Sequence, residues 1–305
     1  MGFIIFILTY SFVWLLHLLP EKVLFLFSDL LYLIGYPVAG YRKKVVFENL
    51  ENAFPELGQD EIRKIARRFY HHLSDLILES AVFHFKSEKK ALQKITYRNP
   101  ELLDEIYRKG KQVMAVTAHY GNWEYLATLN LAIASQVIAI YKPLKNKYFD
   151  RMVTRNRTRF GVQVIPMEKI ARELIKHHQE GNPVLTLFLS DQRPVFQNIQ
   201  YWTRFLGLDT PLYLGTEKLA RKLDAAVVFL KIHKVSRGRY EAEFELICDE
   251  PGTLEPFEIT ESHVRILENL IRETPEYWLW SHRRWKHSHE EYLEKKGPGK
   301  ASARP

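Results

Sequence analysis

Apolar residues follow two patterns along the chain, and the change between them separates a short N-terminal part from a larger globular part. Residues 2–19 carry no Asp, Glu, Lys or Arg, and residues 23–41 are almost as apolar but contain Asp29, Gly35 and Pro37. From about residue 100, short apolar runs alternate with segments whose apolar residues recur at helical spacing. This alternation predicts an α/β fold in which helices flank a central sheet.

The segment from 225 to 247 predicts that the sheet is mixed. Residues 239–247 alternate between apolar and polar side chains, so we expect them to pair antiparallel with the apolar strand at 225–233. The other expected strands are separated by helices, as in parallel sheets. We predict these strands at 112–118, 136–141, 161–166 and 183–190, and helices at 60–83, 100–108, 122–134, 146–160, 168–181, 212–223 and 258–273.

The N-terminal apolar run predicts contact with a membrane. Eighteen residues in a helix span about 27 Å, close to the ~30 Å hydrocarbon core of a bilayer. The basic residues at 42–44 favour the cytoplasmic side. A buried core helix or a cleaved signal peptide is the alternative, although Met1–Tyr10 lacks the basic start of a signal peptide. We therefore predict an N-terminal membrane anchor and interfacial helix over 1–45, a globular domain over 46–290 and a disordered tail over 291–305.

Composition and charge narrow the class of partner. The 305 residues are 46% hydrophobic and 26% charged, which is typical of a chain that folds around a core. The formal net charge of +8 suggests an acidic partner such as nucleic acid, an anionic membrane surface or an acidic protein. No basic-aromatic nucleic-acid motif is present, so we expect no nucleic acid. Cys248 is the single cysteine, so no disulfide can form within the chain.

The stretch VTAHYGNWEYLA at 116–127 is the strongest candidate for chemistry. His119 follows a predicted strand, where ligands bind in open α/β sheets. On one continuous helix His119 and Glu124 would point roughly 140° apart, so they can meet only if the backbone bends between them. Gly121 permits such a bend, and Asn122 is a good N-cap for the next helix. A carboxylate that holds one nitrogen of a histidine ring lets the other take a proton from a hydroxyl. A capping carboxylate beside an unrelated histidine is the other interpretation.

Several separated blocks, in order along nearly the whole chain, carry a resemblance to a known family. The chain resembles the lipid A biosynthesis acyltransferases of the late, lauroyl- or myristoyl-transferring type, within the wider lysophospholipid acyltransferase group. The segment DQRPVFQN departs from relatives that carry acidic or aromatic residues after the same Asp, which bears on the acceptor or chain length. The matching blocks are HYGNWE, YKPLKNKYFDRMVTRNRTRFG at 141–161, LSDQ at 189–192, RFLGLDTPLYLGTEKLA at 204–220 and EYWLWSHRRWK at 276–286.

The resemblance implies a glycerolipid acyltransferase-like fold and a reaction. It implies transfer of a fatty acyl group from acyl carrier protein to a hydroxyl of a lipid A precursor or related glycolipid. The enzyme would lie at the cell inner membrane, with residues 46–290 as the catalytic domain on the cytoplasmic side. His119 would be the general base and Glu124 its orienting partner. Thioester acyl transfer needs no metal or organic cofactor, and we expect neither.

Further residues are candidates for binding substrate. Arg157 and Arg159 match the paired arginines of the family and would bind phosphate or thioester oxygen, since guanidinium groups suit such oxygens; a solvated basic face is the alternative. Backbone N–H groups near Gly121 and Asn122, or an arginine, could bind the oxyanion. Asp191 ends a predicted strand on the same edge as His119 and would order the site or merely cap a turn.

Two further groups of residues, at 278–286 and at 205–214, allow either a functional or a core-packing interpretation. The aromatic and basic residues at 278–286 suggest either lipid contact or core packing. Phe205, Leu206 and residues 212–214 line an acyl groove or pack in the core. The paired histidines at 71–72 and 177–178 lack metal-ligand spacing.

Two other functions are compatible with the sequence. The acceptor could be a lysophospholipid, an ornithine-type lipid or another glycolipid. Alternatively, the protein could bind or tether lipid without catalysis, although His119 and Glu124 are both present.

Overall fold

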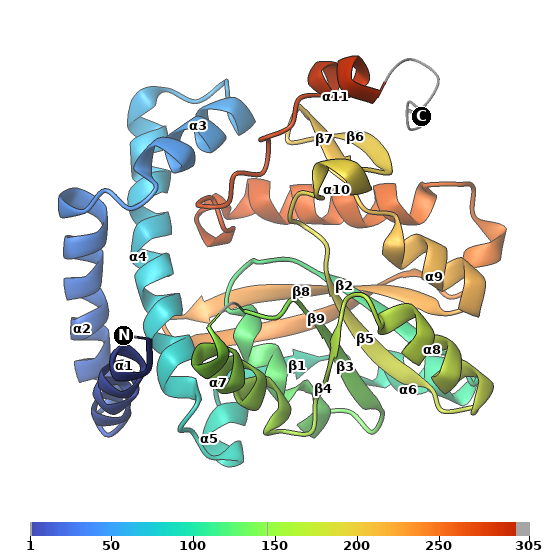
Figure 1. Cartoon of the computed structure of the whole chain (residues 1–305), viewed down its shortest axis with the longest axis horizontal. Helices are drawn as coiled ribbons and strands as arrows, with labels where there is room; N and C mark the ends of the chain where they lie inside the picture. Colours follow the sequence, from blue (N-terminus) through green and yellow to red (C-terminus); the bar gives the residue numbers. More distant parts are fainter. Residues whose placement is uncertain (1, 145, 297–305) are drawn as a thin grey trace.

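A seven-stranded mixed sheet forms the centre of the protein (Figure 1). The computed structural model describes residues 2–144 and 146–296. The strand order is β1-β9-β8-β2-β5-β3-β4, and all neighbours are parallel except β8 and β9. The prediction of a mixed sheet is therefore confirmed. The strands are β1 (Ile95–Arg98), β2 (Val113–Thr117), β3 (Gln136–Tyr141), β4 (Gln163–Pro166), β5 (Val184–Leu189), β8 (Ala226–Ser236) and β9 (Arg239–Cys248).

Helices pack on both faces of this sheet, so its central strands are buried on both sides. In β2, Met114 and Val116 belong to one core cluster, whereas Val113 and Ala115 belong to the other. Such alternation follows from the two-residue period of a strand. The helices are α3 (Lys43–Ala53), α4 (Gln59–Phe83), α5 (Glu88–Leu92), α6 (Glu101–Arg108), the 3₁₀ helix η2 (Trp123–Leu131), α7 (Lys147–Thr158), α8 (Ile170–Gln179), α9 (Gly215–Leu223), α10 (Glu258–Glu273) and α11 (His289–Lys296), with short helices η3 (Phe196–Asn198), η4 (Pro251–Thr253) and η5 (Pro275–Tyr277).

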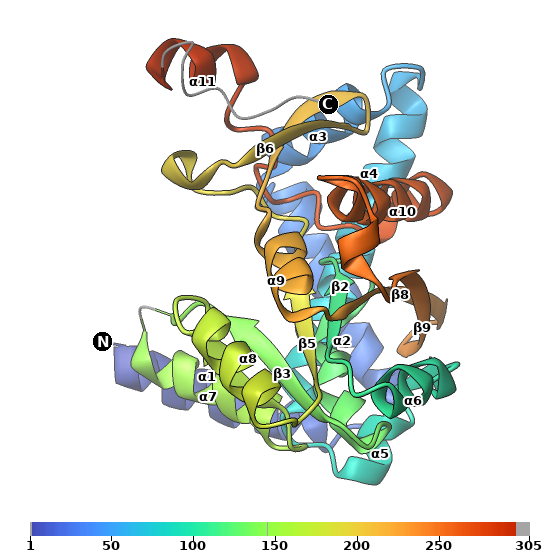
Figure 2. The same ribbon diagram turned by 90° about the vertical axis from the view of Figure 1, so that its right-hand side faces the viewer.

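A small hairpin, β6 (Tyr201–Phe205) and β7 (Leu208–Leu212), forms a second sheet outside the main one (Figure 2). Its two-residue turn consists of Leu206 and Gly207, both at positive φ. The helix predicted from residue 212 begins only at Gly215 because β7 occupies the preceding residues. Phe205 and Leu206 are buried in the main core, so core packing is the interpretation that holds for them.

The N-terminal part forms α1 (Gly2–His17), α2 (Glu21–Leu33) and a π-helical turn, η1 (Ile34–Val38), beside α4 (Figure 1). Leu16 and Leu24 are buried against α4, while Phe12, Leu15 and Leu30 are among many apolar side chains left exposed. Within the described residues, no single helix has the length and apolar character needed to cross a membrane. Residues 21–38 and α3 meet that requirement only together, with a bend of 84° between them.

The tail predicted from residue 291 onward begins within the C-terminal helix α11. Residues 297–305 of the predicted tail lie outside the described residues.

Candidate active site

His119 and Asp191 come together because the two strands that precede them are neighbours. β2 and β5 pair in parallel, with Thr117 opposite Leu189. The backbone N–H of Ser190 continues this pairing by donating to the carbonyl of Thr117 at 3.0 Å. Both loops therefore leave the sheet at the same edge, where ligands of open α/β sheets bind.

The His119 ring is held by a buried carboxylate. His119 Nδ1 lies 2.7 Å from Asp191 Oδ1, and the indole of Trp278 donates to Asp191 Oδ2 at 2.9 Å. Burial alone would raise the pKa of Asp191, but the charge and hydrogen bond of His119 and the Trp278 bond outweigh it and hold that pKa low. Because a carboxylate only accepts hydrogen bonds, Nδ1 carries a proton, and in the neutral ring the lone pair is on Nε2. The Gln192 side-chain amide lies 3.2 Å from this Nε2.

Glu124 has different partners from those that the His-x4-Glu spacing suggested. Its carboxylate accepts from Arg157 Nη2 at 2.8 Å, from Arg157 Nε at 3.4 Å and from the Trp123 indole at 3.2 Å. Among the described residues, no hydrogen bond joins His119 to Glu124; the carboxylate that contacts the imidazole is Asp191. Glu124 instead fixes a guanidinium beside the same cavity.

The two candidate arginines lie in different places. Arg157 lines the cavity that contains His119. Arg159 points to the end of α4, where Nη1 donates to the carbonyl of Phe83 at 3.3 Å and also to that of His84. Arg159 therefore closes a helix end, a common position for a basic side chain.

The backbone bend after His119 forms as predicted. Gly121 has φ +61°, and a Cβ built there would lie 2.8 Å from Ile232 Cγ2, so both conformation and space require glycine. Its N–H donates to the carbonyl of Tyr277 at 3.0 Å. That N–H is thus already used and does not face an oxyanion. Asn122 precedes η2, but its side chain makes no capping bond and donates to Glu79 at 2.7 Å.

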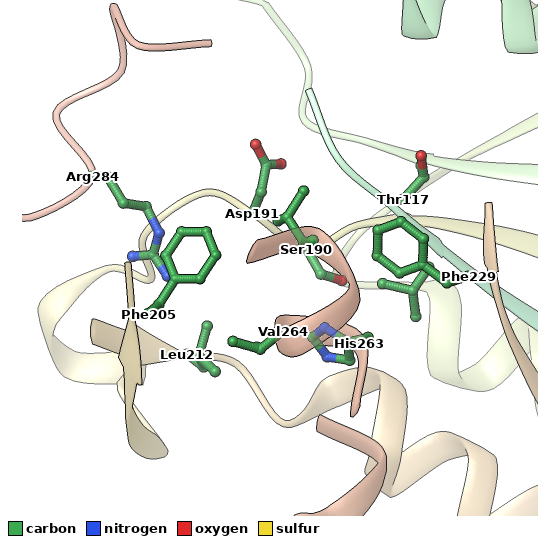
Figure 3. Close-up of a pocket in the computed structure, with 11 residues that line it drawn as sticks. Thr117, Ser190, Asp191, Phe205, Leu212, Phe229, His263, Val264 and Arg284 are labelled. Carbon is green, nitrogen blue, oxygen red and sulfur yellow. The ribbon is translucent and has the colours of Figure 1, made fainter. Parts of the chain in front are cut away.

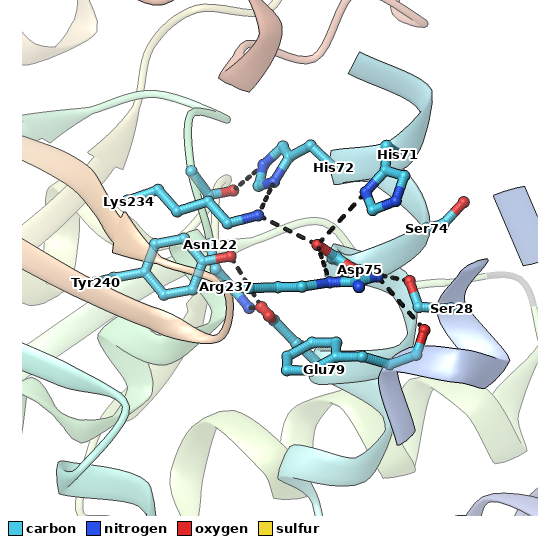
Figure 4. A network of polar contacts seen from close by, with 12 residues as sticks. Ser28, His71, His72, Ser74, Asp75, Glu79, Asn122, Lys234, Arg237 and Tyr240 are labelled. Atoms are coloured by element: carbon cyan, nitrogen blue, oxygen red, sulfur yellow. Dashed lines mark hydrogen bonds and ion pairs between the residues drawn. The ribbon is translucent and has the colours of Figure 1, made fainter. Parts of the chain in front are cut away.

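A buried polar network of side chains from α4, β8 and β9 contacts the loop that contains Gly121 and Asn122 (Figure 4). Glu79 Oε2 accepts from Asn122 and, at 2.9 Å, from the Tyr240 hydroxyl. Burial raises the pKa of Glu79 to about 7 despite these bonds. His72 Nε2 lies 3.2 Å from the carbonyl of Gly121, and burial with the nearby charge of Lys234 lowers the pKa of His72 to about 3. A neutral His72 therefore donates to the active-site loop.

The network continues to the N-terminal helices through Asp75 (Figure 4). Asp75 accepts from Arg237 at 2.7 Å, from Lys234 at 3.2 Å and from Ser28 of α2 at 2.7 Å. Burial would raise the pKa of Asp75, but Arg237 and Lys234 hold it low. A continuous set of polar contacts thus joins α2, α4, the β8–β9 hairpin and the loop that contains Gly121.

The main cavity, of about 550 Å³, opens beside the free face of His119. Its polar end contains His119, Glu124, Arg157 and Gln192, and the His119 side chain is 17% exposed. Its walls are largely apolar and come from β3, β5, α8 and α9. The volume lies within the ~300–1,000 Å³ typical of ligand pockets. A basic nitrogen at the polar end of an apolar cavity suits a substrate with one polar reacting group and a hydrocarbon chain.

The other side of Asp191 is closed. A cavity of about 10 Å³, room for about one water molecule, is lined by Asp191, His263 and Arg284 among other residues (Figure 3). Arg284 is 1% exposed, and burial lowers its pKa to about 10 despite the charge of Asp191. Burial also lowers the pKa of His263 to about 4, which leaves this ring neutral. This small cavity therefore leaves no room for a substrate on the side of Asp191 that faces away from His119.

The aromatic and basic residues at 278–286 are mostly core residues. Trp278, Trp280 and Arg284 are buried, and Arg284 donates to the carbonyl of Pro211 at 2.9 Å. Core packing is therefore the correct interpretation for these three. The sequence pattern missed the function of Trp278, which fixes Asp191. Within the described part of the chain, no group of three or more His, Cys, Asp or Glu side chains could hold a metal ion.

Comparison with known proteins decides the family. Residues 2–287 match the family described as bacterial lipid A biosynthesis acyltransferases. The chain belongs to this family. It is 22% identical to a lipid A biosynthesis lauroyltransferase of Escherichia coli (strain K12) over 277 residues, 90% of this chain and 88% of that protein. It is 23% identical, with the same coverages, to a lipid A biosynthesis palmitoleoyltransferase of Escherichia coli (strain K12) and to a lipid A biosynthesis acyltransferase of Shigella flexneri. As a member of this family the protein is an acyltransferase.

Proposed function

We propose that the protein moves a fatty acyl group from acyl carrier protein to a hydroxyl of a lipid A precursor, at the cytoplasmic side of the inner membrane. The observation that carries this proposal is the His119–Asp191 pair at the polar end of an apolar cavity. A protonated Nδ1 held by a carboxylate leaves Nε2 as the base, as acyl transfer to an alcohol requires.

The reaction follows from the contacts of His119. The acceptor hydroxyl displaces the Gln192 amide from Nε2 and gives its proton to this nitrogen as its oxygen attacks the thioester carbonyl. A C–O bond forms, and the C=O electron pair becomes an oxyanion. Asp191 stabilises the imidazolium. As the oxyanion collapses, the C–S bond breaks and the imidazolium protonates the leaving thiolate, which releases acyl carrier protein with its free thiol.

Arg157 is the candidate for oxyanion stabilisation. Glu124 binds it through Nε and Nη2, and among the described residues no hydrogen bond from its Nη1 is found. A guanidinium whose orientation is fixed before the reaction can stabilise the developing charge without reorganisation. Glu124 then acts through Arg157 and is a positioning residue.

Surface features support the donor and the membrane location. The net charge of +8 complements an acidic carrier protein and a phosphorylated lipid. Exposed apolar side chains of α1 and α2, such as Phe12 and Leu30, would enter the lipid interface. The names of the relatives at 22–23% identity agree with a lipid A acceptor.

The test uses full-length protein in detergent with dodecanoyl–acyl carrier protein and a panel of acceptors, analysed by mass spectrometry. We expect one added acyl mass on a lipid A precursor that carries 3-hydroxyacyl chains, and loss of this product in His119→Ala with unchanged expression and membrane association. Transfer only to a lysophospholipid or an ornithine-type lipid would overturn the acceptor. A protein that neither transfers nor hydrolyses any thioester would overturn catalysis.

A further inference from the structure

A second apolar cavity lies against the main one and shares a wall with it. Its volume is about 320 Å³, and it lies between the facing surfaces of α4 and α7. Trp123 and Glu124 line both cavities. The Trp123 ring also packs edge-on against the His119 ring, with 4.8 Å between ring centroids. The two cavities therefore converge on the side chains that surround the proposed base.

Two converging cavities fit the number of substrates in the proposed reaction. Both the thioester and the acceptor carry a hydrocarbon chain, and both must reach His119 Nε2 in the same complex. A single apolar cavity would make the two chains compete for one site. The second cavity is largely apolar, with Leu76, Met152 and Val153 among its lining residues, so its physical character suits a hydrocarbon chain.

The rims of the cavities indicate which chain enters which. Lys142 and Lys218 line the main cavity and are exposed, which suits a donor delivered by an acidic carrier protein. No Lys or Arg of the described residues lines the second cavity. It includes the half-exposed Ile77 of α4, and α1 packs on both α4 and α7, the two helices that form its walls. A lipid that lies in the membrane beside α1 would reach this cavity first.

We propose that the second cavity binds the hydrocarbon chain of the acceptor lipid, and that the main cavity holds the donor acyl chain. Trp123 and Glu124 separate the two chains, so that the acceptor hydroxyl and the thioester carbonyl meet at His119. This assignment rests on the proposed function, because only a reaction between two lipid chains requires both cavities.

The kinetic test fills each cavity in turn with the same substitution. Ala81→Phe, on α4, narrows the second cavity, and Ala171→Phe, on α8, narrows the main one. Ala81→Phe should raise KM for a 3-hydroxyacyl lipid A precursor by about tenfold, the scale of discrimination by apolar pockets, with donor KM near the wild-type value. Ala171→Phe should raise donor KM and shift the preference to shorter thioesters. An Ala81→Phe effect on the donor alone, or on neither substrate, would overturn the assignment.

A second measurement does not depend on turnover or on the folding of a filled variant. A lipid A precursor with a diazirine at the end of its 3-hydroxyacyl chain is irradiated with the wild-type protein, and the labelled peptides are mapped. We expect labels on α4 and α7, near Ala81 and Met152. Labels confined to α8 or β3 would place the acceptor chain in the main cavity and refute the proposal.

The two hypotheses fail in different ways. Wild-type protein that transfers to no acceptor defeats the proposed function. Wild-type protein that transfers, but labels only the main cavity, leaves that function intact and defeats the cavity assignment alone. Met152→Ala, which enlarges the second cavity, supplies a gain-of-function check: it should improve transfer to a precursor with a bulkier hydroxyacyl chain, and no change would count against the assignment.

Discussion

Replacing Asp191 by asparagine should reverse the tautomer of His119 with little change in shape. The Trp278 indole can only donate, so it requires an acceptor oxygen on residue 191. The introduced asparagine must therefore turn its carbonyl oxygen to Trp278 and its NH₂ group to His119 Nδ1. A nitrogen that accepts this bond cannot carry the proton, so the proton moves to Nε2 and the base loses its lone pair.

The expected loss is large in rate and modest in stability. A catalytic histidine held in the wrong tautomer loses about 10⁴ in kcat. One buried, charge-assisted hydrogen bond lost to a neutral side chain costs about 1–3 kcal/mol of unfolding free energy. Because the pKa of Asp191 is held low in the fold, its contribution is present above the unfolded pKa and is lost as the pH falls through the folded pKa. The stability gap between the two proteins should narrow in acid.

The assay is kcat for acyl transfer by Asp191→Asn, with urea unfolding to confirm the fold and ¹⁵N NMR of the imidazole to identify the tautomer. Asp191→Asn with Trp278→Phe is the matched control, because without the indole the introduced amide can turn its oxygen to Nδ1 and recover part of the rate. An Asp191→Asn enzyme that keeps a rate within about tenfold of wild type, against the ~10⁴ loss expected for a reversed tautomer, would refute the reasoning.

Three further predictions concern the supports of the active-site loop. Gly121→Ala should lower the free energy of unfolding, measured in urea, by about 2–4 kcal/mol, because alanine would be strained at positive φ and would overpack against Ile232. Gly110→Ala is the control: Gly110 has φ +71° but open space around it, so this variant should lose only the part that comes from backbone strain. Equal losses of unfolding free energy in the two variants would contradict this prediction. Glu79→Gln should gain stability relative to wild type as the pH rises from 4.5 to 7, since over this range the unfolded wild type releases the Glu79 proton whereas the folded protein, in which the pKa is raised to about 7, keeps it; thermal melts with a constant difference across this range would argue against it. Asp75→Asn should cost about 3–5 kcal/mol in unfolding free energy because buried positive charge loses its anion; a loss below ~1 kcal/mol would show that the network contributes little.

The sequence pattern predicted six of the seven strands of the main sheet, but neither β1 at its edge nor the β6–β7 hairpin. Buried runs such as 112–118 and 183–190 have the length and neighbours of parallel strands, and both form as β2 and β5. The β6–β7 hairpin was not predicted, because its turn places Leu206 at φ 51°, a conformation that favours glycine and that leucine rarely adopts. Most of the hairpin lies in the block at 204–220 that resembles the family, where no strands are predicted from the sequence.

The candidate site shows the same limit at the level of side chains. His119 and Asp191 could be assigned to one edge of the sheet because each follows a strand. Local spacing favoured Glu124 as the partner of His119, whereas the observed contact comes from a residue 72 positions away that the pairing of β2 with β5 brings near. The tryptophans at 278 and 280 gave no signal of burial, since the same residues are typical of membrane interfaces.

The most direct measurement is mass spectrometry of lipid A from cells that lack this protein and are complemented with either the wild type or His119→Ala. The account predicts lipid A lighter by one acyl group in the deletion strain, restored by the wild type but not by His119→Ala. Unchanged lipid A in the deletion strain, or full restoration by His119→Ala, would contradict it.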